Sequence, residues 1–446
     1  MEHCLPTEED LRLTEALCGF LSKSPSPFHT VEAIRTRLDA HGFVCLDEGQ
    51  NWDLRLGGSY YTTRNGSSIL AFTVGQELCD PKFSIAVSHS DSPTYKIKAV
   101  PELVGPGPYV KLNVEGYGGM IDRTWLDRPL SLAGRVMVEE FGNISSRLFA
   151  PDEDLLLIPS VSIHQDREVN KSGSLNRQVD MCPLYSSADG DADGFAQMIA
   201  ARLDVTPSQV LAYDLVLVNR QQPTIWGAAR EFVSAGRLDD LQCAFASLEA
   251  FVGSSNKNRI SVFGCFDNEE VGSGTKQGAL STFLADVLER ICECLGKSRG
   301  EYLRGIQESF VVSCDNAHAV HPNHPELYDE RNRVWLNQGI VIKESAPMRY
   351  TTDAQSRALF EIVCRRAGIP VQSFANRSDS AGGSTLGNLL MRTVSMRALD
   401  IGLPQLAMHS SYETAGVRDT AFLTHALCEF YEADYTFCSD GSIVVG

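Results

Sequence analysis

The stretch RISVFGCFDNEEVGS, residues 259–273, joins an apolar run to a cluster of carboxylates. Residues 260–266 have the pattern of a strand that is buried on both faces, and three carboxylates follow within residues 267–270, before the chain turns at Gly272. A carboxylate is costly to bury unless it is paired or binds a metal. An acidic surface loop is the simplest explanation of such a cluster, so the rest of the chain has to decide between a loop and a site.

The composition is that of a soluble globular protein. The chain has 446 residues, enough for two or three domains, with 43% hydrophobic and 22% charged residues. Its net charge of −18 argues against nucleic acid or an anionic membrane as the main partner. The 13 cysteines form no CxxC pair, and the N-terminus lacks the order of a signal peptide. We therefore expect reduced thiols, a cytoplasmic location and no membrane span.

Two kinds of pattern divide the chain. Helical spacing in the first forty residues, where Thr30 is a candidate cap, is followed by strand-like runs, and strands and helices alternate again after Gly236. Between these parts, short strand-like runs are separated by glycine and proline. We predict an α/β domain with a mixed, largely parallel sheet flanked by helices, formed by residues 1–92 and 235–446, and a β-rich domain inserted at 93–234.

Potential metal ligands follow five of the strand-like runs. In open α/β sheets, ligands collect beyond the carboxyl ends of the strands. We therefore expect these side chains to gather at one edge of the sheet. They are His89 with Asp91, Asp239 with Asp240, Glu269 with Glu270, Asp315 and His409.

This set of side chains fits a pair of divalent metal ions. Two histidines and three carboxylates can hold two ions, with one carboxylate bridging them and a position left open for water. Such a pair, about 3.5–4 Å apart, activates the water and stabilises an oxyanion. A further carboxylate is then needed to move the proton, and the adjacent Glu269 and Glu270 can supply a base and a ligand. Asp91 can orient His89.

Seven motifs in order along the chain resemble those of the aspartyl aminopeptidase family of dinuclear zinc exopeptidases. The resemblance extends from Ser24 to about Glu413, and the combination is far more specific than any one motif. The motifs are SPSPFH (24–29), SHSDSP (88–93), TWLDRPLSLAGRV (124–136), GRLDDLQ (236–242), DNEEVGS (267–273), DNAHAVHPN (315–323) and PQLAMHS (404–410).

The resemblance implies a role for each residue of the predicted site. The cofactors would be two divalent ions per subunit, zinc first, with manganese or cobalt as alternatives. Glu269 would be the general base and acid, and Asp91 would support His89. The ligands would be Asp239 as the bridge, His89 and Asp315 at one ion, and Glu270 and His409 at the other.

The resemblance also implies an assembly. The β-rich insert would be a dimerisation domain, and dimers would build a tetrahedral dodecamer. His164, in VSIHQD, matches a histidine that reaches into the active site of a neighbouring subunit, where it would contact substrate or the oxyanion. Two alternatives stay open for His164: a metal ligand, or a strand-end histidine that is bonded locally.

Substrates of the family carry an N-terminal Asp or Glu, which calls for a cation in the pocket. Lys343 matches the family position associated with the acidic side chain, and Tyr350 lies in a segment that lines the substrate. Lys343 could equally be a strand-edge lysine that extends to solvent. Gly382 and Gly383, in DSAGGSTLG, resemble a glycine-rich loop near the substrate, although a tight turn gives the same pattern.

The chain departs from the family pattern at two acidic positions. Asp240 adds a carboxylate beside the bridge, which favours harder ions such as manganese or cobalt. Asp353 stands where an uncharged residue is usual, and a charge directed into the pocket would weaken selection for acidic substrates. A histidine cluster at His318, His321 and His324 is left out of the ligand set.

These observations predict a metalloaminopeptidase (EC 3.4.11) that removes an N-terminal Asp or Glu from peptides. One alternative is a related dinuclear aminopeptidase or deacylase that takes neutral residues or N-acyl substrates. Another is a non-catalytic assembly protein on a peptidase fold, which the presence of every catalytic group disfavours.

Overall fold

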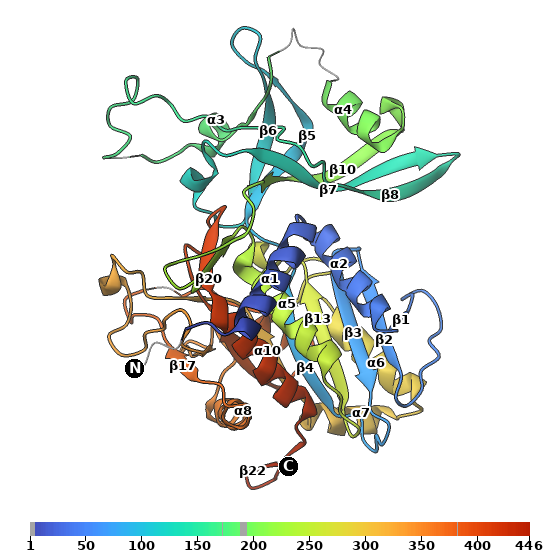
Figure 1. The fold of residues 1–446 in the computed structure, drawn as a ribbon. Helices are drawn as coiled ribbons and strands as arrows, with labels where there is room; N and C mark the ends of the chain where they lie inside the picture. The colour runs from blue at the N-terminus through green and yellow to red at the C-terminus, as the bar shows by residue number, and fades with distance from the viewer. Residues whose placement is uncertain (1–4, 172, 188–193, 381) are drawn as a thin grey trace.

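The largest element of the computed structural model, which describes residues 5–171, 173–187, 194–380 and 382–446, is a nine-stranded mixed sheet (Figure 1). In spatial order its strands are β1 (Val44–Cys45), β2 (Ser59–Arg64), β3 (Ser68–Val74), β13 (Ile260–Phe266), β4 (Phe83–His89), β14 (Phe310–Cys314), β18 (Arg397–Gly402), β16 (Ile340–Lys343) and β17 (Val371–Phe374). The four strands from β13 to β18 are mutually parallel. The predicted mixed, largely parallel sheet is therefore confirmed.

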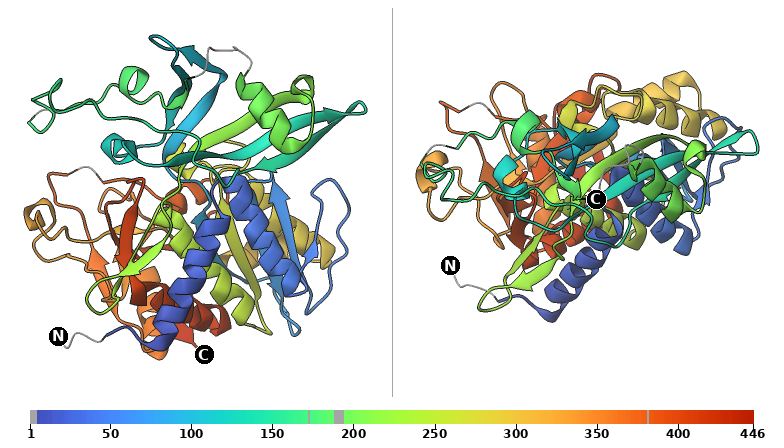
Figure 2. Two further views of the ribbon diagram at one scale, coloured as in Figure 1. Left: turned by 45° about the horizontal axis from the view of Figure 1, so that its top comes forward. Right: turned by 90° about the horizontal axis from the view of Figure 1, so that it is seen from above.

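Helices cover both faces of this sheet (Figures 1 and 2). One face packs against α1 (Glu8–Lys23), α2 (Pro27–Ala40), α5 (Leu238–Gly253), α8 (Ala354–Arg366) and α10 (Val417–Glu432), and the other against α6 (Phe283–Cys294), α7 (Arg299–Gln307) and α9 (Leu386–Leu390). Every residue of β4 and β13 is buried between these two layers. This burial explains why both strands are almost continuously apolar.

The predicted cap of the second helix was wrong. The N-cap of α2 is Ser26, and Thr30 lies inside the helix, where its hydroxyl donates to the Ser26 carbonyl. Pro27 starts the helix because its fixed φ suits the first helical position and its missing N–H is not needed there. A turn at Asn65-Gly66 joins β2 to β3, and both of its residues have positive φ angles.

A second, six-stranded sheet lies between β4 and α5 in the chain. It is antiparallel throughout and is called the insert sheet below. Its own apolar core includes residues of α4 (Gly194–Leu203). In spatial order its strands are β8 (Asn143–Phe149), β7 (Leu130–Glu140), β10 (Val210–Asn219), β5 (Thr94–Val104), β6 (Val110–Tyr117) and β9 (Leu184–Ser186). Figures 1 and 2 show this sheet stacked over one end of the nine-stranded sheet.

A third sheet corrects one expectation about the site. It contains, in spatial order, β11 (Thr224–Trp226), β12 (Phe232–Ala235), β20 (Glu413–Gly416), β19 (Pro404–Leu406) and β15 (Ala317–His318). Asp239 and His409 follow strands of this sheet, so the five ligand positions do not all lie on one sheet edge. The chain passes from the nine-stranded sheet to this sheet at Leu403, between β18 and β19.

The remaining elements are small. A short helix, α3 (Arg177–Asp180), follows the long loop after β8, and a hairpin of β21 (Tyr435–Phe437) and β22 (Ile443–Val445) lies near the end of the chain. In the part of the chain that the structure describes, none of the helices has the length and apolar character needed to cross a membrane.

Candidate active site

Three neighbouring parallel strands direct chemical groups to one point. β4 ends at His89, β13 leads to Glu269 and Glu270, and β14 leads to Asp315. Because β4 lies between β13 and β14, their carboxyl ends bring these groups together. Asp239, from the start of α5, and His409, after β19, reach the same point. The described residues offer three groups that could hold a metal: His89, Asp239 and Asp315; His89, Glu269 and Glu270; and Asp239, Glu270 and His409.

The carboxylate of Asp239 lies between the two histidines. Its Oδ1 is 3.5 Å from Nε2 of His89, and its Oδ2 is 3.3 Å from Nε2 of His409. Glu270 Oε1 lies 3.4 Å from the same His409 nitrogen. One carboxylate therefore presents a separate oxygen to each half of the cluster, the arrangement that a bridging ligand requires.

Two buried carboxylates behind the cluster hold its backbone in place. Asp240 accepts the backbone N–H of His89 at 3.0 Å. Glu413 accepts those of Asp239 at 3.0 Å and His409 at 2.7 Å. The carboxylate of Asp240 thus accepts from the backbone, and Asp240 is not among the described residues that line the pocket or form the metal-binding groups. Its expected influence on the choice of metal stays a prediction.

Asp91 holds the turn that carries the two glutamates. Its carboxylate accepts the backbone N–H of Glu269 at 3.1 Å and that of Glu270 at 3.2 Å. The same carboxylate lies 3.4 Å from Nδ1 of His89, and the Asp91 carbonyl is 3.0 Å from that nitrogen. Asp91 therefore orients both His89 and the turn.

Acidic side chains outnumber basic ones in the cluster and directly behind it. Burial raises the pKa of Glu269 and that of Glu413 to about 8, because an anion is poorly solvated there. Asp239 Oδ1 and Glu270 Oε1 are buried and accept no hydrogen bond from any described residue. Buried carboxylate oxygens without donors, beside two imidazoles, fit divalent cations of the zinc type.

A pocket of about 290 Å³ opens onto this cluster. Lys343 is the only lysine or arginine among its described lining residues. Its ammonium donates to the Asn316 carbonyl at 2.8 Å and lies 3.4 Å from Asp315 Oδ1. Tyr350 lines the same wall, with its ring centre 5.7 Å from that ammonium.

The glycine-rich loop contributes only in part. Gly383 lines the pocket, whereas Gly382 does not. A Cβ on Gly382 would meet the side-chain amide of Asn376, so a larger residue there would require that amide to move.

Asp353 does not point into the pocket. Its side chain accepts the Ser356 N–H at 2.8 Å and caps α8. The condition under which its charge would weaken selection for acidic substrates is therefore not met, because the carboxylate caps a helix end and Asp353 is not among the described residues that line the pocket.

The three clustered histidines, His318, His321 and His324, belong to none of the potential metal-binding groups of the described residues. His318 alone of the three lines the pocket among the described residues. His164 is exposed in the loop between β8 and α3, a segment that Figure 1 shows extending from the body of the molecule. His164 is not among the residues that line this pocket or form those groups.

Sequence reasoning missed the supporting residues. Glu413, Tyr117 and Gly119 contact the cluster from behind or from the insert sheet. No local sequence pattern marks any of these three residues.

The fold and this pocket define a metal-dependent hydrolase, and comparisons with known proteins make the assignment specific. The family described as Aminopeptidase I zinc metalloprotease (M18) matches residues 20–431. The chain is 42% identical to a probable M18 family aminopeptidase 2 of Clostridium novyi, over 94% of this chain and 99% of that protein. It is 38% identical to aspartyl aminopeptidase 1 of Schizosaccharomyces pombe, over 93% of each.

A solved structure agrees with these sequence comparisons. One chain of the structure of the S. cerevisiae mApe1 dodecamer superposes on this chain with a TM-score of 0.82 at 28% identity, over 95% of this chain and 97% of that chain. The chain belongs to the M18 family of zinc metalloaminopeptidases.

Proposed function

We propose that this aminopeptidase prefers peptides with an N-terminal Asp or Glu. The observation that carries the proposal is Lys343, a buried cation on the wall of a pocket otherwise rich in carboxylates. An ammonium has three N–H donors. One N–H of Lys343 donates to the Asn316 carbonyl, and the Asp315 carboxylate lies near a second. The third N–H is then available to a substrate carboxylate. The similarity to an aspartyl aminopeptidase supports the same preference.

Two divalent ions, first of all zinc, would occupy the cluster. Asp239 would bridge them, with one ion held by His89 and Asp315 and the other by Glu270 and His409. The separate oxygens that Asp239 presents to the two histidines support this division. Bound there, the ions would polarise the scissile carbonyl and lower the pKa of a water.

Glu269 would take the proton from that water and return it to the leaving amine. Its support is its position at the pocket wall, next to the ligands, on a turn fixed by Asp91. Lys343, Tyr350 and the backbone near Gly383 would orient the substrate. Gly382 would act only by allowing the loop to pack.

The assembly proposed is a dimer that builds a tetrahedral dodecamer, with residues 93–234 as the oligomerisation domain inserted between 1–92 and 235–446. The dodecamer of the mApe1 relative and the exposed loop that carries His164 support it. In that assembly His164 would contact substrate in a neighbouring subunit, with ligation of a metal as the alternative. The free cysteines of the described chain suit the proposed cytoplasmic location.

Hydrolysis of aspartyl-, glutamyl-, leucyl- and lysyl-p-nitroanilide tests the specificity. We expect the acidic substrates to be preferred, and Lys343→Met to lose that preference while it keeps turnover of the leucyl substrate. Lys257→Met, at an exposed lysine, is the control. A wild type that prefers the leucyl substrate would contradict the role of Lys343 and favour a neutral-residue aminopeptidase.

Reconstitution of the chelated enzyme with zinc, manganese or cobalt tests the metal. We expect the zinc-loaded enzyme to bind two ions per chain and to be more active than the enzyme loaded with manganese or cobalt. One ion per chain at full activity would contradict the dinuclear proposal.

A further inference from the structure

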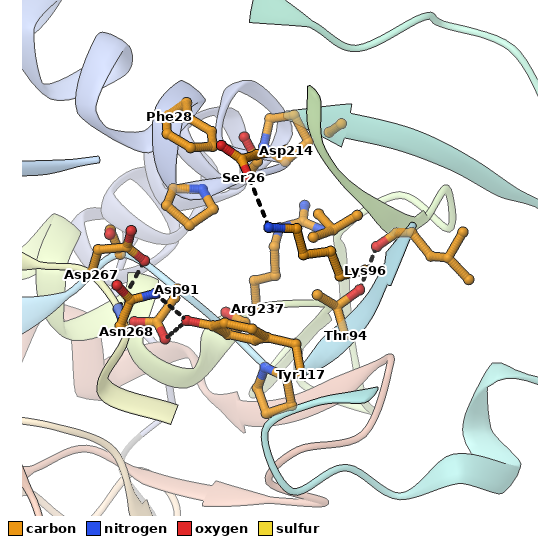
Figure 3. A pocket seen from close by; sticks show the side chains of 18 of the residues that line it. Ser26, Phe28, Asp91, Thr94, Lys96, Tyr117, Asp214, Arg237, Asp267 and Asn268 are labelled. Atoms are coloured by element: carbon orange, nitrogen blue, oxygen red, sulfur yellow. Dashed lines mark hydrogen bonds and ion pairs between the residues drawn. The ribbon is translucent and has the colours of Figure 1, made fainter. Parts of the chain in front are cut away.

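A tyrosine of the insert sheet contacts the turn that carries the two glutamates. Tyr117 is the last residue of β6, and its hydroxyl donates to Asp91 Oδ2 at 2.7 Å. The same hydroxyl accepts a hydrogen bond from Nδ2 of Asn268 at 2.8 Å (Figure 3). These three side chains line a cavity of about 390 Å³ at the junction of the insert sheet and the large sheet. The hydroxyl thus contacts both groups that fix the turn.

Asn268 is held in one orientation. Its φ of 66° is in the left-handed region, which asparagine tolerates better than most residues. Its Oδ1 accepts hydrogen bonds from Thr275 and Gln277, both at 2.8 Å, so its amide N–H group is left to face Tyr117. Since Glu269 follows directly, a shift of Asn268 would move the proposed base.

The next residues of the same segment hold His409. Nδ1 of His409 is 2.5 Å from the Gly119 carbonyl, and the Ile121 N–H donates to the His409 carbonyl at 3.0 Å. The contact with a carbonyl requires that Nδ1 carry the proton, which leaves Nε2 free to face Asp239 and Glu270. One segment of five residues therefore fixes groups on both sides of the metal cluster.

We propose that residues 117–121 form a clamp, through which the insert sheet positions the catalytic turn and His409 of its own subunit, with Tyr117 as a positioning residue. The insert then has a role in catalysis beyond contacts between subunits. This inference rests on the roles proposed above for Glu269, Glu270 and His409, but not on the preference for acidic substrates.

Tyr117→Phe tests the clamp because it removes the hydroxyl and keeps the ring. Partners of this kind, which orient groups that bind metal, typically change activity or metal affinity by about 10–100-fold. We expect kcat to fall by about that factor on the best p-nitroanilide of the wild type, with KM within about threefold, and zinc to be lost faster to a chelator. Tyr213→Phe is the matched control, because this half-buried insert tyrosine bonds the Lys98 carbonyl instead.

Asn268→Gly removes the same hydrogen bond from the other side and suits the positive φ. Because each variant also removes bonds of its own, Tyr117 to Asp91 and Asn268 to Thr275 and Gln277, only the shared bond couples them. The loss of kcat in the double variant Tyr117→Phe/Asn268→Gly should therefore be smaller than the sum of the two single losses, whereas Tyr213→Phe should add independently. This variant also serves if Tyr117→Phe does not fold.

The proposal is overturned if kcat and zinc release in Tyr117→Phe stay within twofold of wild type while only its melting temperature falls. It is equally overturned if Tyr213→Phe reduces kcat as much. The test uses whichever p-nitroanilide the wild type hydrolyses best. Its outcome therefore does not depend on whether the enzyme prefers acidic N-terminal residues.

Discussion

Glu269 and Glu270 are neighbours in the sequence but lie in different surroundings. Glu270 is within ion-pair distance of His409. Among the described residues, Glu269 belongs to one potential metal-binding group, with His89 and Glu270. We expect Glu269→Gln to lower kcat by about 10²–10⁴-fold, because a general base is lost, while both metal ions stay bound. Activity and metal content measured on the same sample check this. Loss of one metal together with activity would make Glu269 a ligand instead.

His29 makes the protein sensitive to acid. Burial, with a smaller contribution from the charge of Arg237, lowers its pKa from 6.5 to about 4. Its Nδ1 is 2.7 Å from the Ser26 hydroxyl, which the neutral ring can accept. The unfolded chain therefore binds a proton at His29 that the folded chain does not, and stability falls as the pH drops from about 6.5 to 4.

The pH dependence of unfolding checks this effect. Between pH 7 and pH 5, His29→Asn should lose about 2 kcal/mol less of its free energy of unfolding than the wild type, as urea titrations measure. The asparagine Oδ1 can still accept from Ser26. An equal loss in both proteins would show that His29 titrates normally.

The residues that could be predicted from the sequence are those marked by a local pattern. His89, Glu270 and Asp315 follow apolar strands, so a strand-end rule found them. Tyr117 could not be found this way, because its partners Asp91 and Asn268 are distant in sequence or belong to another sheet. Such contacts depend on how the two sheets are placed, which strand patterns do not specify.

At the scale of elements, Asp353 has a structural role. Its carboxylate and the Ser356 side chain form a capping box at the start of α8. Asp353→Ala should destabilise the protein by about 1 kcal/mol and leave the ratio of acidic to neutral substrate turnover unchanged. Chemical denaturation and the p-nitroanilide panel measure the two effects.

Asp353→Asn, which keeps a capping oxygen, is the control for this prediction. A changed substrate ratio in both variants would show that the charge of Asp353 reaches the pocket after all.

The strand patterns predicted elements more reliably than their partners. The expected strand at 260–266 matches β13, and the expected alternation of strands and helices after Gly236 is present from α5 to α8. The same patterns could not tell that β12 and β19 belong to a separate sheet, because a short apolar run pairs equally well with many neighbours. Asp239 and His409 were therefore placed on the wrong sheet edge, although both were expected at the site.

At the scale of the whole molecule, the metal cluster links the sheets. Its side chains follow strands of the nine-stranded and five-stranded sheets, and the insert sheet supports it. Removal of the metal with a chelator should lower the melting temperature, because binding to the folded state alone stabilises it. Calorimetry with and without added zinc measures this shift. An unchanged melting temperature in protein shown to be metal-free would contradict it.

The proposed assembly has a candidate contact at the tip of the β7–β8 hairpin. Phe141 is fully exposed there, and Ile144 is 63% exposed. Large apolar side chains that lie together at a surface often mark a contact with a partner. With chains of 48.9 kDa, a dodecamer has a mass of about 590 kDa. Phe141→Ser should shift the mass measured by light scattering towards smaller species, because the contact loses apolar area.

Leu303→Ser, at a half-exposed leucine of α7, should leave the mass unchanged. An unchanged mass in Phe141→Ser would place the contacts elsewhere on the molecule, and a wild type of 48.9 kDa would contradict the assembly itself.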